Sequence, residues 1–271
     1  FYTMLDTIAW DILVGKPPEL NATWSFLSEH ADGIIYISEY TRDRFRARFP
    51  MSQMTPGYVS HLSFDPHDYV IQAVKDEPHD SKTFILVVGN SFDHKNVGPT
   101  VDLLSSRFPS HVIKALGLRN HPGSRVVPLE SGQIPQIDMD RLFARAVIIV
   151  FPSFYEGFGF PILKGLSYGR TVIARQSGLL AEIASHYRGR GRLIAFRTAT
   201  ELAEAVGRVL DGSEIAEAPL GGALDASAKP MDWTAVAAGV LGFIEERVQD
   251  VAASRWPARQ CAIEQMTAYA I

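Results

Sequence analysis

Short apolar runs alternate with segments of helical periodicity between residues 83 and 211, and this alternation constrains the fold more than any other feature of the chain. The runs are rich in β-branched residues and mostly free of charge, as expected of parallel strands that are buried on both faces. Strands that alternate with helices predict an α/β fold with a Rossmann-type, doubly wound parallel sheet and right-handed crossovers. The expected strands are 83–89, 111–116, 125–129, 146–151, 171–174 and 192–196, with helices ending near 107 and at 138–145, 161–168 and 199–211.

The region before this alternation predicts a smaller amount of regular structure. Residues 33–37 form one more apolar run, and Ser38 is a suitable N-cap for a helix that continues to about residue 49. The stretch 56–78 is rich in Pro, His, Asp and Tyr and lacks periodicity, which is typical of an interdomain linker. We therefore expect residues 1–80 to hold a first domain and the linker.

The C-terminal region is expected to be helical. Residues 221–230 are typical of a loop, Asp232 is placed to cap a helix over 233–248, and a further helix is expected over 252–271. The second Rossmann-like domain is therefore expected over 81–231, followed by C-terminal helices over 232–271.

Composition limits the classes of function. The chain has 271 residues, a net charge of −4 and 46% hydrophobic residues, which favours a globular protein of two domains and gives no electrostatic argument for nucleic acid. A single cysteine, Cys261, indicates a reducing compartment, and no apolar run reaches the roughly 20 residues that span a bilayer. No histidine spacing matches a zinc signature, so we expect no metal. We expect a cytoplasmic protein.

The stretch that follows the apolar run 146–151 is the strongest candidate for a functional site. Pro161 suits the first turn of a helix, which places Glu156 in a strand-to-helix loop at the carboxyl end of a strand, where α/β sheets bind ligands. Gly157 and Gly159 allow the backbone to approach a ligand, and the helix N-terminus offers N–H groups to an anion. A glycine-rich connection with an exposed glutamate is the simpler alternative for a Gly-x-Gly pair alone.

The whole string Pro-Ser-Phe-Tyr-Glu-Gly-Phe-Gly-Phe-Pro, residues 152–161, is much more specific. It closely resembles the donor-site signature of the retaining glycosyltransferases of family four, which have the GT-B fold, and the resemblance extends from about residue 30 to about residue 250. It implies transfer of a hexose, with retention and without a metal or cofactor, from a GDP- or UDP-hexose to a glycan or lipid-linked acceptor. Polysaccharide or lipopolysaccharide biosynthesis is the implied setting. Compared with the family, the first Rossmann-like domain is expected to be truncated, and a C-terminal helix is expected to cross back to it.

The resemblance also assigns roles to individual residues. Lys95 matches the family's phosphate-binding lysine, and Glu156 matches a family glutamate whose implied role is to bind hydroxyls of the donor sugar. The amides of Gly157, Phe158 and Gly159 are expected to face the sugar and phosphates. The remaining donor-binding positions implied by the resemblance are Gly89 and Asn90, and Val127 and Leu129, where the family reads the base.

Three positions depart from the family pattern. Asn90 stands where the family usually has an arginine, Lys164 where it has a second glutamate, and Leu5-Asp6 where it often has His-Asp. Lys164 is expected either to contact a donor phosphate and so replace a missing cation, or to be a solvated surface residue. The other candidates for a replacement cation are Arg175, Arg188, Arg190 and Arg192.

These departures leave alternatives open. The chain is expected to bind a nucleotide sugar and an acceptor, but a catalytically weak or inactive module that binds a nucleotide sugar or a partner glycosyltransferase fits the same residues. A sugar-nucleotide epimerase of similar fold is less favoured. Four arginines at 42, 44, 46 and 48 spread around one helix, which favours a solvated helix over a patch for peripheral contact with the inner face of a membrane.

Overall fold

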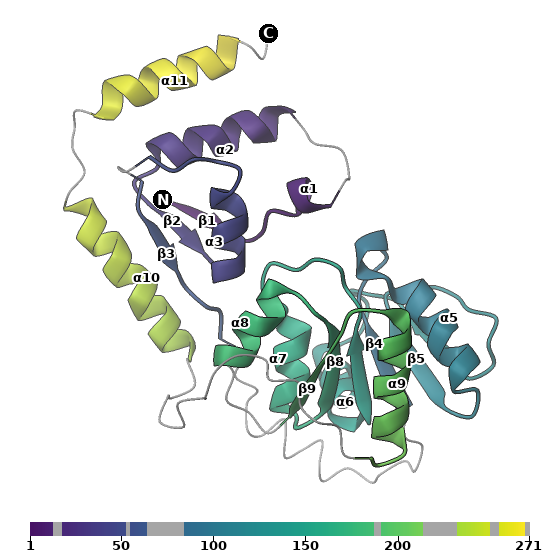
Figure 1. Ribbon diagram of the computed structural model, residues 1–271. Coiled ribbons are helices and arrows are strands. Elements are labelled where there is room, and N and C mark those ends of the chain that lie inside the picture. The colour runs from purple at the N-terminus through teal and green to yellow at the C-terminus, as the bar shows by residue number, and fades with distance from the viewer. Residues whose placement is uncertain are drawn as a thin grey trace. The chain divides into compact units, whose positions relative to one another are not determined.

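The computed structural model describes residues 1–12, 18–52, 55–63, 84–186, 191–213, 232–249 and 255–268 (Figure 1). The chain divides into two units, the first formed by residues 1–63 with 231–271 and the second by residues 64–230. Each unit contains its own parallel sheet. The second unit carries the larger sheet and the candidate site, so its architecture is given first.

The second unit is built on six parallel strands in the order β6-β5-β4-β7-β8-β9. The central strands β4 and β7 are buried along their whole length, as their unbroken apolar sequences require. The strands confirm the expected Rossmann-type sheet, and the ends of each lie within two residues of the ends of an expected run. Their bounds are β4 Phe84–Val88, β5 Val112–Leu116, β6 Val126–Leu129, β7 Ile148–Phe151, β8 Thr171–Arg175 and β9 Arg192–Phe196.

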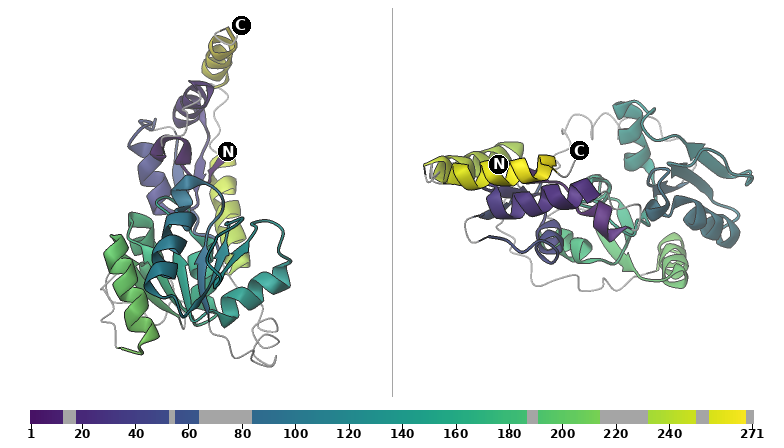
Figure 2. Two further views of the ribbon diagram at one scale, coloured as in Figure 1. Left: turned by 90° about the vertical axis from the view of Figure 1, so that its right-hand side faces the viewer. Right: turned by 90° about the horizontal axis from the view of Figure 1, so that it is seen from above.

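Helices cover both faces of this sheet. Helices α5 and α9 pack against each other on one face, and α6 and α7 contact each other on the other face (Figures 1 and 2). Apolar side chains of α5 and α9, among them Leu104 and Val206, close the core over Ile85 and Val87. The bounds are α5 Val97–Arg107, α6 Gln136–Arg145, α7 Phe160–Ser167, α8 Gly178–His186 and α9 Ala199–Leu210, with a short 3-10 turn η1 at Asp93–Lys95.

The direction of winding reverses between β4 and β7. From β4 the chain moves outward through β5 to β6, and it then returns to β7 and moves the other way through β8 to β9. The loops that leave the carboxyl ends of β4 and β7 therefore diverge from each other. In an open α/β sheet this topological switch point is where ligands bind.

The first unit has a sheet of three parallel strands in the order β1-β2-β3. Its core is aromatic, with Trp24 stacked on Trp10 at a centroid distance of 4.0 Å and Tyr36 and Phe45 fully buried. The Ser38 side chain accepts from the Thr41 N–H, which confirms the expected N-cap. The elements are β1 Tyr2–Met4, α1 Ile8–Asp11, α2 Pro18–His30, β2 Ile34–Tyr36, α3 Glu39–Arg46 and β3 Gly57–Val59.

The C-terminal helices, α10 Trp233–Val248 and α11 Trp256–Ala268, belong to the first unit. Asp232 caps α10 through a 2.7 Å bond from the Ala235 N–H, as expected. The ring of Phe243 stacks on Tyr58 at 5.2 Å and packs against the backbone of Gly33. Helix α11 contacts α2 (Figure 1) and is tied to Asp32 by ion pairs from Arg255 and Arg259.

Some expectations for the first unit are wrong. Strand β3 lies inside the stretch that we predicted to be a linker, because its three residues are too short to show periodicity. The arginine-rich helix is not simply solvated, since Arg44 and Arg48 both pair with the buried carboxylate of Asp11. The predicted domain boundaries at 80/81 and 231/232 stay predictions. The rest of the predicted linker, 64–78, and the predicted loop 221–230 lie outside the described residues.

Candidate functional site

Lys95 and Glu156 meet at the carboxyl edge of the six-stranded sheet. Lys95 is the last residue of η1, which follows β4, and Glu156 lies in the loop between β7 and α7. Lys95 Nζ lies 2.5 Å from Glu156 Oε1, and the two side chains are 15% and 18% exposed. The simpler alternative of an exposed glutamate is therefore wrong. The ion pair stands at the switch point, because β4 and β7 are the adjacent strands from which the chain diverges.

Backbone contacts hold the two loops against each other. The N–H of Phe154 donates to the carbonyl oxygen of His94 at 2.8 Å, which joins the loop after β7 to η1. Within that loop, Ser153 Oγ donates to the carbonyl oxygen of Tyr155 at 2.8 Å, and both residues are buried. These contacts fix the backbone on either side of the ion pair, so Lys95 and Glu156 are presented from ordered turns.

Helix α7 begins immediately after the glutamate loop. Gly159 occupies the N-cap with φ +85°, a conformation that an L-residue adopts only with strain. Phe158 is 7% exposed and anchors the loop in the core. The first amides of a helix lack intrahelical partners and carry the positive end of its dipole. Gly157, Phe158 and Gly159 thus connect Glu156 to the N-terminus of α7, the positive end of its dipole.

The other expected donor-binding positions lie at the same edge of the sheet, except Val127. Gly89 and Asn90 come directly after β4, and Asn90 Oδ1 accepts from the Phe92 N–H at 3.1 Å. Gly117, with φ +92°, lies so close to the backbone of Asn90 that a Cβ there would overlap it, and its N–H donates to the Leu129 carbonyl oxygen at 2.8 Å. Asn90 and Leu129 are thereby linked across β5. Val127 is 40% exposed in the middle of β6, two strands away from β4.

Lys164 is buried between two helices. Its Nζ lies 2.7 Å from Asp140 Oδ1 of α6 and 5.1 Å from the ring centroid of Phe143, and the Lys164 and Asp140 side chains are each 10% exposed. Gln136 Nε2 also donates to Asp140 Oδ1, at 3.0 Å. Two effects raise the pKa of Tyr168: the larger is burial of its hydroxyl, and the smaller is the nearby Asp140 carboxylate. The alternative of a solvated Lys164 is wrong, and sequence reasoning missed Asp140 because no local spacing links two different helices.

The arginines that we considered as replacement cations differ in position. Arg175 ends β8 at the carboxyl edge, where its guanidinium lies 4.0 Å from the ring centroid of Phe154. Arg192 begins β9 and therefore lies at the amino edge, so its candidacy is wrong. Arg188 and Arg190 lie outside the described residues. Leu5, in the first unit, is 58% exposed after β1.

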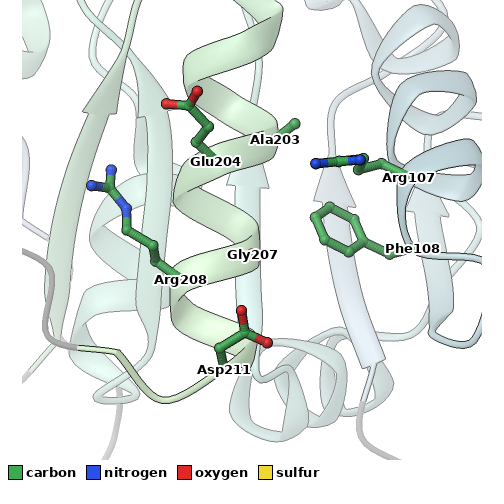
Figure 3. Close-up of a pocket in the computed structure, with 7 residues that line it drawn as sticks. All are labelled: Arg107, Phe108, Ala203, Glu204, Gly207, Arg208 and Asp211. Atoms are coloured by element: carbon green, nitrogen blue, oxygen red, sulfur yellow. The ribbon is translucent and has the colours of Figure 1, made fainter.

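The pocket drawn in Figure 3 is distinct from the ion pair. It lies between the C-terminal end of α5 and the part of α9 from Ala203 onward, and its lining residues are Arg107, Phe108, Ala203, Glu204, Gly207, Arg208 and Asp211. Both helices run from the carboxyl edge of the sheet toward its amino edge. The pocket therefore lies toward the amino edge, whereas Lys95 and Glu156 lie at the carboxyl edge. Within the described residues, no cluster of His, Cys, Asp or Glu is arranged to hold a metal ion, and no helix is long and apolar enough to cross a membrane.

The geometry at the switch point suits an anion joined to a hydroxylated group. The Lys95 ammonium and the Phe160 N–H at the start of α7 are donors to an anion, whereas the Glu156 carboxylate accepts bonds from hydroxyls. Pro161 has no N–H, and the Ile162 N–H already donates to the Gly159 carbonyl oxygen. The two charges neutralise each other in the structure. A ligand with both chemical groups would satisfy both side chains at once.

Comparison with known proteins places this geometry in a family. The sequence profile of the family Glycosyl transferases group 1 matches residues 41–219, which span both loops of the site. The MMP alpha-(1->4)-mannosyltransferase of Mycolicibacterium hassiacum is 27% identical over 130 residues, covering 48% of this chain and 31% of that protein. The O-antigen chain mannosyltransferase B of Escherichia coli is 44% identical over 52 residues, 19% of this chain and 14% of that protein.

A solved structure supports the fold. HepE of Anabaena, determined in complex with UDP-glucose, has a TM-score of 0.57 and 14% identity, and the similarity covers 98% of this chain and 71% of that one. At this identity the likeness shows a fold of the GT-B type and nothing about the ligand. The matches with the two mannosyltransferases span less than a third of the length of either protein.

Proposed function

The chain belongs to the family Glycosyl transferases group 1, and from this premise we propose that it moves a hexose from a nucleotide-diphosphate sugar to a glycan or lipid-linked acceptor, with retention. The similarity to an O-antigen chain mannosyltransferase supports a role in polysaccharide or lipopolysaccharide assembly. We include a cytoplasmic location, with contact at the inner face of the membrane, in the proposal. The single cysteine supports a reducing compartment.

The observation that carries the proposal is the Lys95–Glu156 pair at the switch point. In group transfer from a nucleotide-diphosphate sugar, the bond between the anomeric carbon and the diphosphate oxygen breaks while a bond to the acceptor oxygen forms. Negative charge grows on the leaving diphosphate, and stabilising such charge is usually the largest catalytic contribution. Lys95 and the amides of Gly157, Phe158 and Gly159 supply donors for that charge.

Glu156 has the complementary role. Its carboxylate accepts hydrogen bonds from hydroxyls of the donor sugar and so fixes the anomeric carbon against the acceptor. Gly89, Asn90, Val127 and Leu129 complete the proposed donor site along β4 to β6, where a GDP or UDP base would lie. Because the cations are supplied by the chain itself, we propose that transfer needs neither a metal nor a cofactor.

We also propose that Lys164 donates a hydrogen bond to a phosphate of the nucleotide sugar, as Lys95 does. An ammonium has three N–H groups, and the bond to Asp140 uses one of them. The remaining donors suit a phosphate that reaches Lys164 in the second half of α7, which would offset the cation missing at Asn90.

The same ion pair favours a second candidate. Asp140 neutralises Lys164 locally, so the compensation for Asn90 is incomplete if the pair persists when a donor binds. A module that binds a nucleotide sugar or a partner glycosyltransferase with little or no turnover would then result. Binding without turnover separates this candidate from an active transferase.

A thermal-shift panel of UDP, GDP, ADP and their hexose conjugates tests donor binding. A ligand that binds only the folded state adds about 2.7 kcal/mol of stability at a concentration of 100 times Kd, so one base is expected to raise the Tm of unfolding clearly above the others. Lys95→Ala is expected to remove most of that rise, whereas Arg192→Ala, which deletes the same charge at the amino edge, should retain it. No shift with any nucleotide would contradict the proposed function.

A further inference from the structure

Arg175 joins the carboxyl ends of three neighbouring strands. It is the last residue of β8, and its Nε donates to the carbonyl oxygen of Pro152, directly after β7, at 3.1 Å. Its Nη1 donates to the carbonyl oxygen of Arg197, directly after β9, also at 3.1 Å. Since β7, β8 and β9 are adjacent, one guanidinium bridges this whole part of the sheet edge.

The same guanidinium lies between two aromatic rings. Its central carbon is 4.0 Å from the ring centroid of Phe154 and 4.9 Å from that of Phe196. Phe196 is 1% exposed and gives a rigid base, whereas Phe154 is 55% exposed in the loop that leads to Glu156. A cation within about 6 Å of an aromatic face is attracted to it, so Arg175 holds a ring that would otherwise be free to rotate.

The loop is also held from the opposite side. The Phe154 N–H donates to the carbonyl oxygen of His94, the residue before Lys95. Segment 152–154 is therefore fixed between β8, through Arg175, and η1, through His94. Glu156 follows two residues later, so the direction of its carboxylate depends on where this segment lies.

We propose that Arg175 is the positioning residue for Glu156: by fixing segment 152–154 it sets the carboxylate opposite Lys95 and, on the basis of the proposed function, against the donor sugar. Arginine is needed because a planar guanidinium can stack on rings while it donates to two carbonyls, which an ammonium cannot. A misplacement of about 1 Å at a reacting group costs roughly 100-fold in rate. Arg175 thus acts on the reaction through Glu156.

Hydrogen exchange tests the positioning without a known donor. In Arg175→Ala and Arg175→Lys, the Phe154 amide is expected to exchange roughly tenfold faster. The reason is that the loop loses local stability equal to the net contribution of about one hydrogen bond. Arg197→Ala is the matched control, because it keeps the carbonyl that Arg175 contacts and deletes only the side chain, which donates to Gln176. Unchanged exchange of Phe154 in both Arg175 variants, or equal acceleration in Arg197→Ala, would overturn the proposal. If Arg175→Ala does not fold, exchange of the Phe154 amide in Arg175→Lys alone tests the proposal.

Kinetics with the donor found by the thermal-shift panel then separate positioning from phosphate binding. Arg175→Ala is expected to lower kcat by roughly 10- to 100-fold and to leave the Kd of the nucleoside diphosphate unchanged, since Lys95 is intact. Arg175→Lys should restore little of kcat. A tenfold or greater loss of nucleoside diphosphate affinity would show that the guanidinium binds phosphate itself, against the proposal. If the parent chain turns over no donor, the proposed function fails, while the exchange result still decides the positioning.

Discussion

At the scale of residues, the central feature is that a lysine and a glutamate from different loops neutralise each other. A salt bridge whose side chains are 15% and 18% exposed gains little net stability, because desolvation of the two charges offsets much of their attraction. A donor that offers a phosphate to Lys95 and hydroxyls to Glu156 therefore gains two contacts for the loss of one weak pair. We propose separable roles for the two residues, which single substitutions test.

Lys95→Ala is expected to weaken binding of the nucleoside diphosphate and to leave binding of the nucleoside unchanged. A charge-assisted hydrogen bond to phosphate contributes about 1.5–3 kcal/mol, which corresponds to a loss of roughly ten- to 100-fold in affinity. Isothermal titration calorimetry with both ligands measures the difference, and Arg192→Ala controls for the change in net charge. Equal losses for the nucleoside and the nucleoside diphosphate would remove Lys95 from the phosphate site.

At the scale of elements, a buried ion pair joins α6 to α7. Removing one partner of such a pair leaves an uncompensated charge, so Lys164→Met is expected to lower the free energy of unfolding by about 3 kcal/mol. Asp140→Asn in the same chain should recover part of this loss, because it removes the unpaired carboxylate. Chemical denaturation of the four proteins in a double-mutant cycle gives the coupling.

The control for that cycle is Arg208→Met, which replaces an exposed cation of α9 by the same apolar residue and should change stability by no more than about 0.5 kcal/mol. A Lys164→Met protein as stable as the parent would mean that Lys164 is solvated in solution. In that case the packing of α6 on α7 does not depend on the pair.

Element length alone did not decide which elements could be predicted, since the three-residue strand β2 was predicted and the 13-residue helix α2 was not. The central strands β4 and β7 were predictable because burial on both faces demands unbroken apolar runs, and the partly exposed outer strands were predicted from further short, mostly apolar runs. Strands β1 and β3, unlike β2, do not lie in an unbroken apolar run, and α8 was missed because its mixed pattern resembles a loop after a glycine. The pairing of Lys164 with Asp140 depends on how two helices pack, which no local pattern encodes.

For the candidate site, the order of strands and loops in the sequence predicted that Lys95 and Glu156 lie at the same edge of the sheet. Both follow buried strands, and the carboxyl ends of parallel strands share an edge. Two features required the structure: the strand order that makes β4 and β7 neighbours, and the side-chain contacts of Arg175 with the loop after β7. Val127 and Leu129 were placed by resemblance alone, and their role stays a prediction.

At the scale of the whole molecule, the two units differ in how the chain builds them. The second unit is continuous in sequence, whereas the first combines residues 1–63 with the C-terminal helices. The buried ring of Phe243 on α10 packs against Gly33 and Tyr58, which are more than 180 residues away in the chain. Because transfer brings donor and acceptor together, the proposed turnover would need the whole chain, whereas we propose donor binding for the second unit alone.

The most direct test of the central claim is to follow hydrolysis or transfer of the donor by NMR in the parent chain and in Glu156→Gln. We expect the first sugar product of the parent to keep the anomeric configuration of the donor. Glu156→Gln should lose most turnover, by roughly 100-fold or more, while it binds the nucleoside diphosphate as tightly as the parent, since Lys95 remains and is no longer paired with a carboxylate. An inverted first product, or a Glu156→Gln protein with the turnover of the parent, would contradict the account.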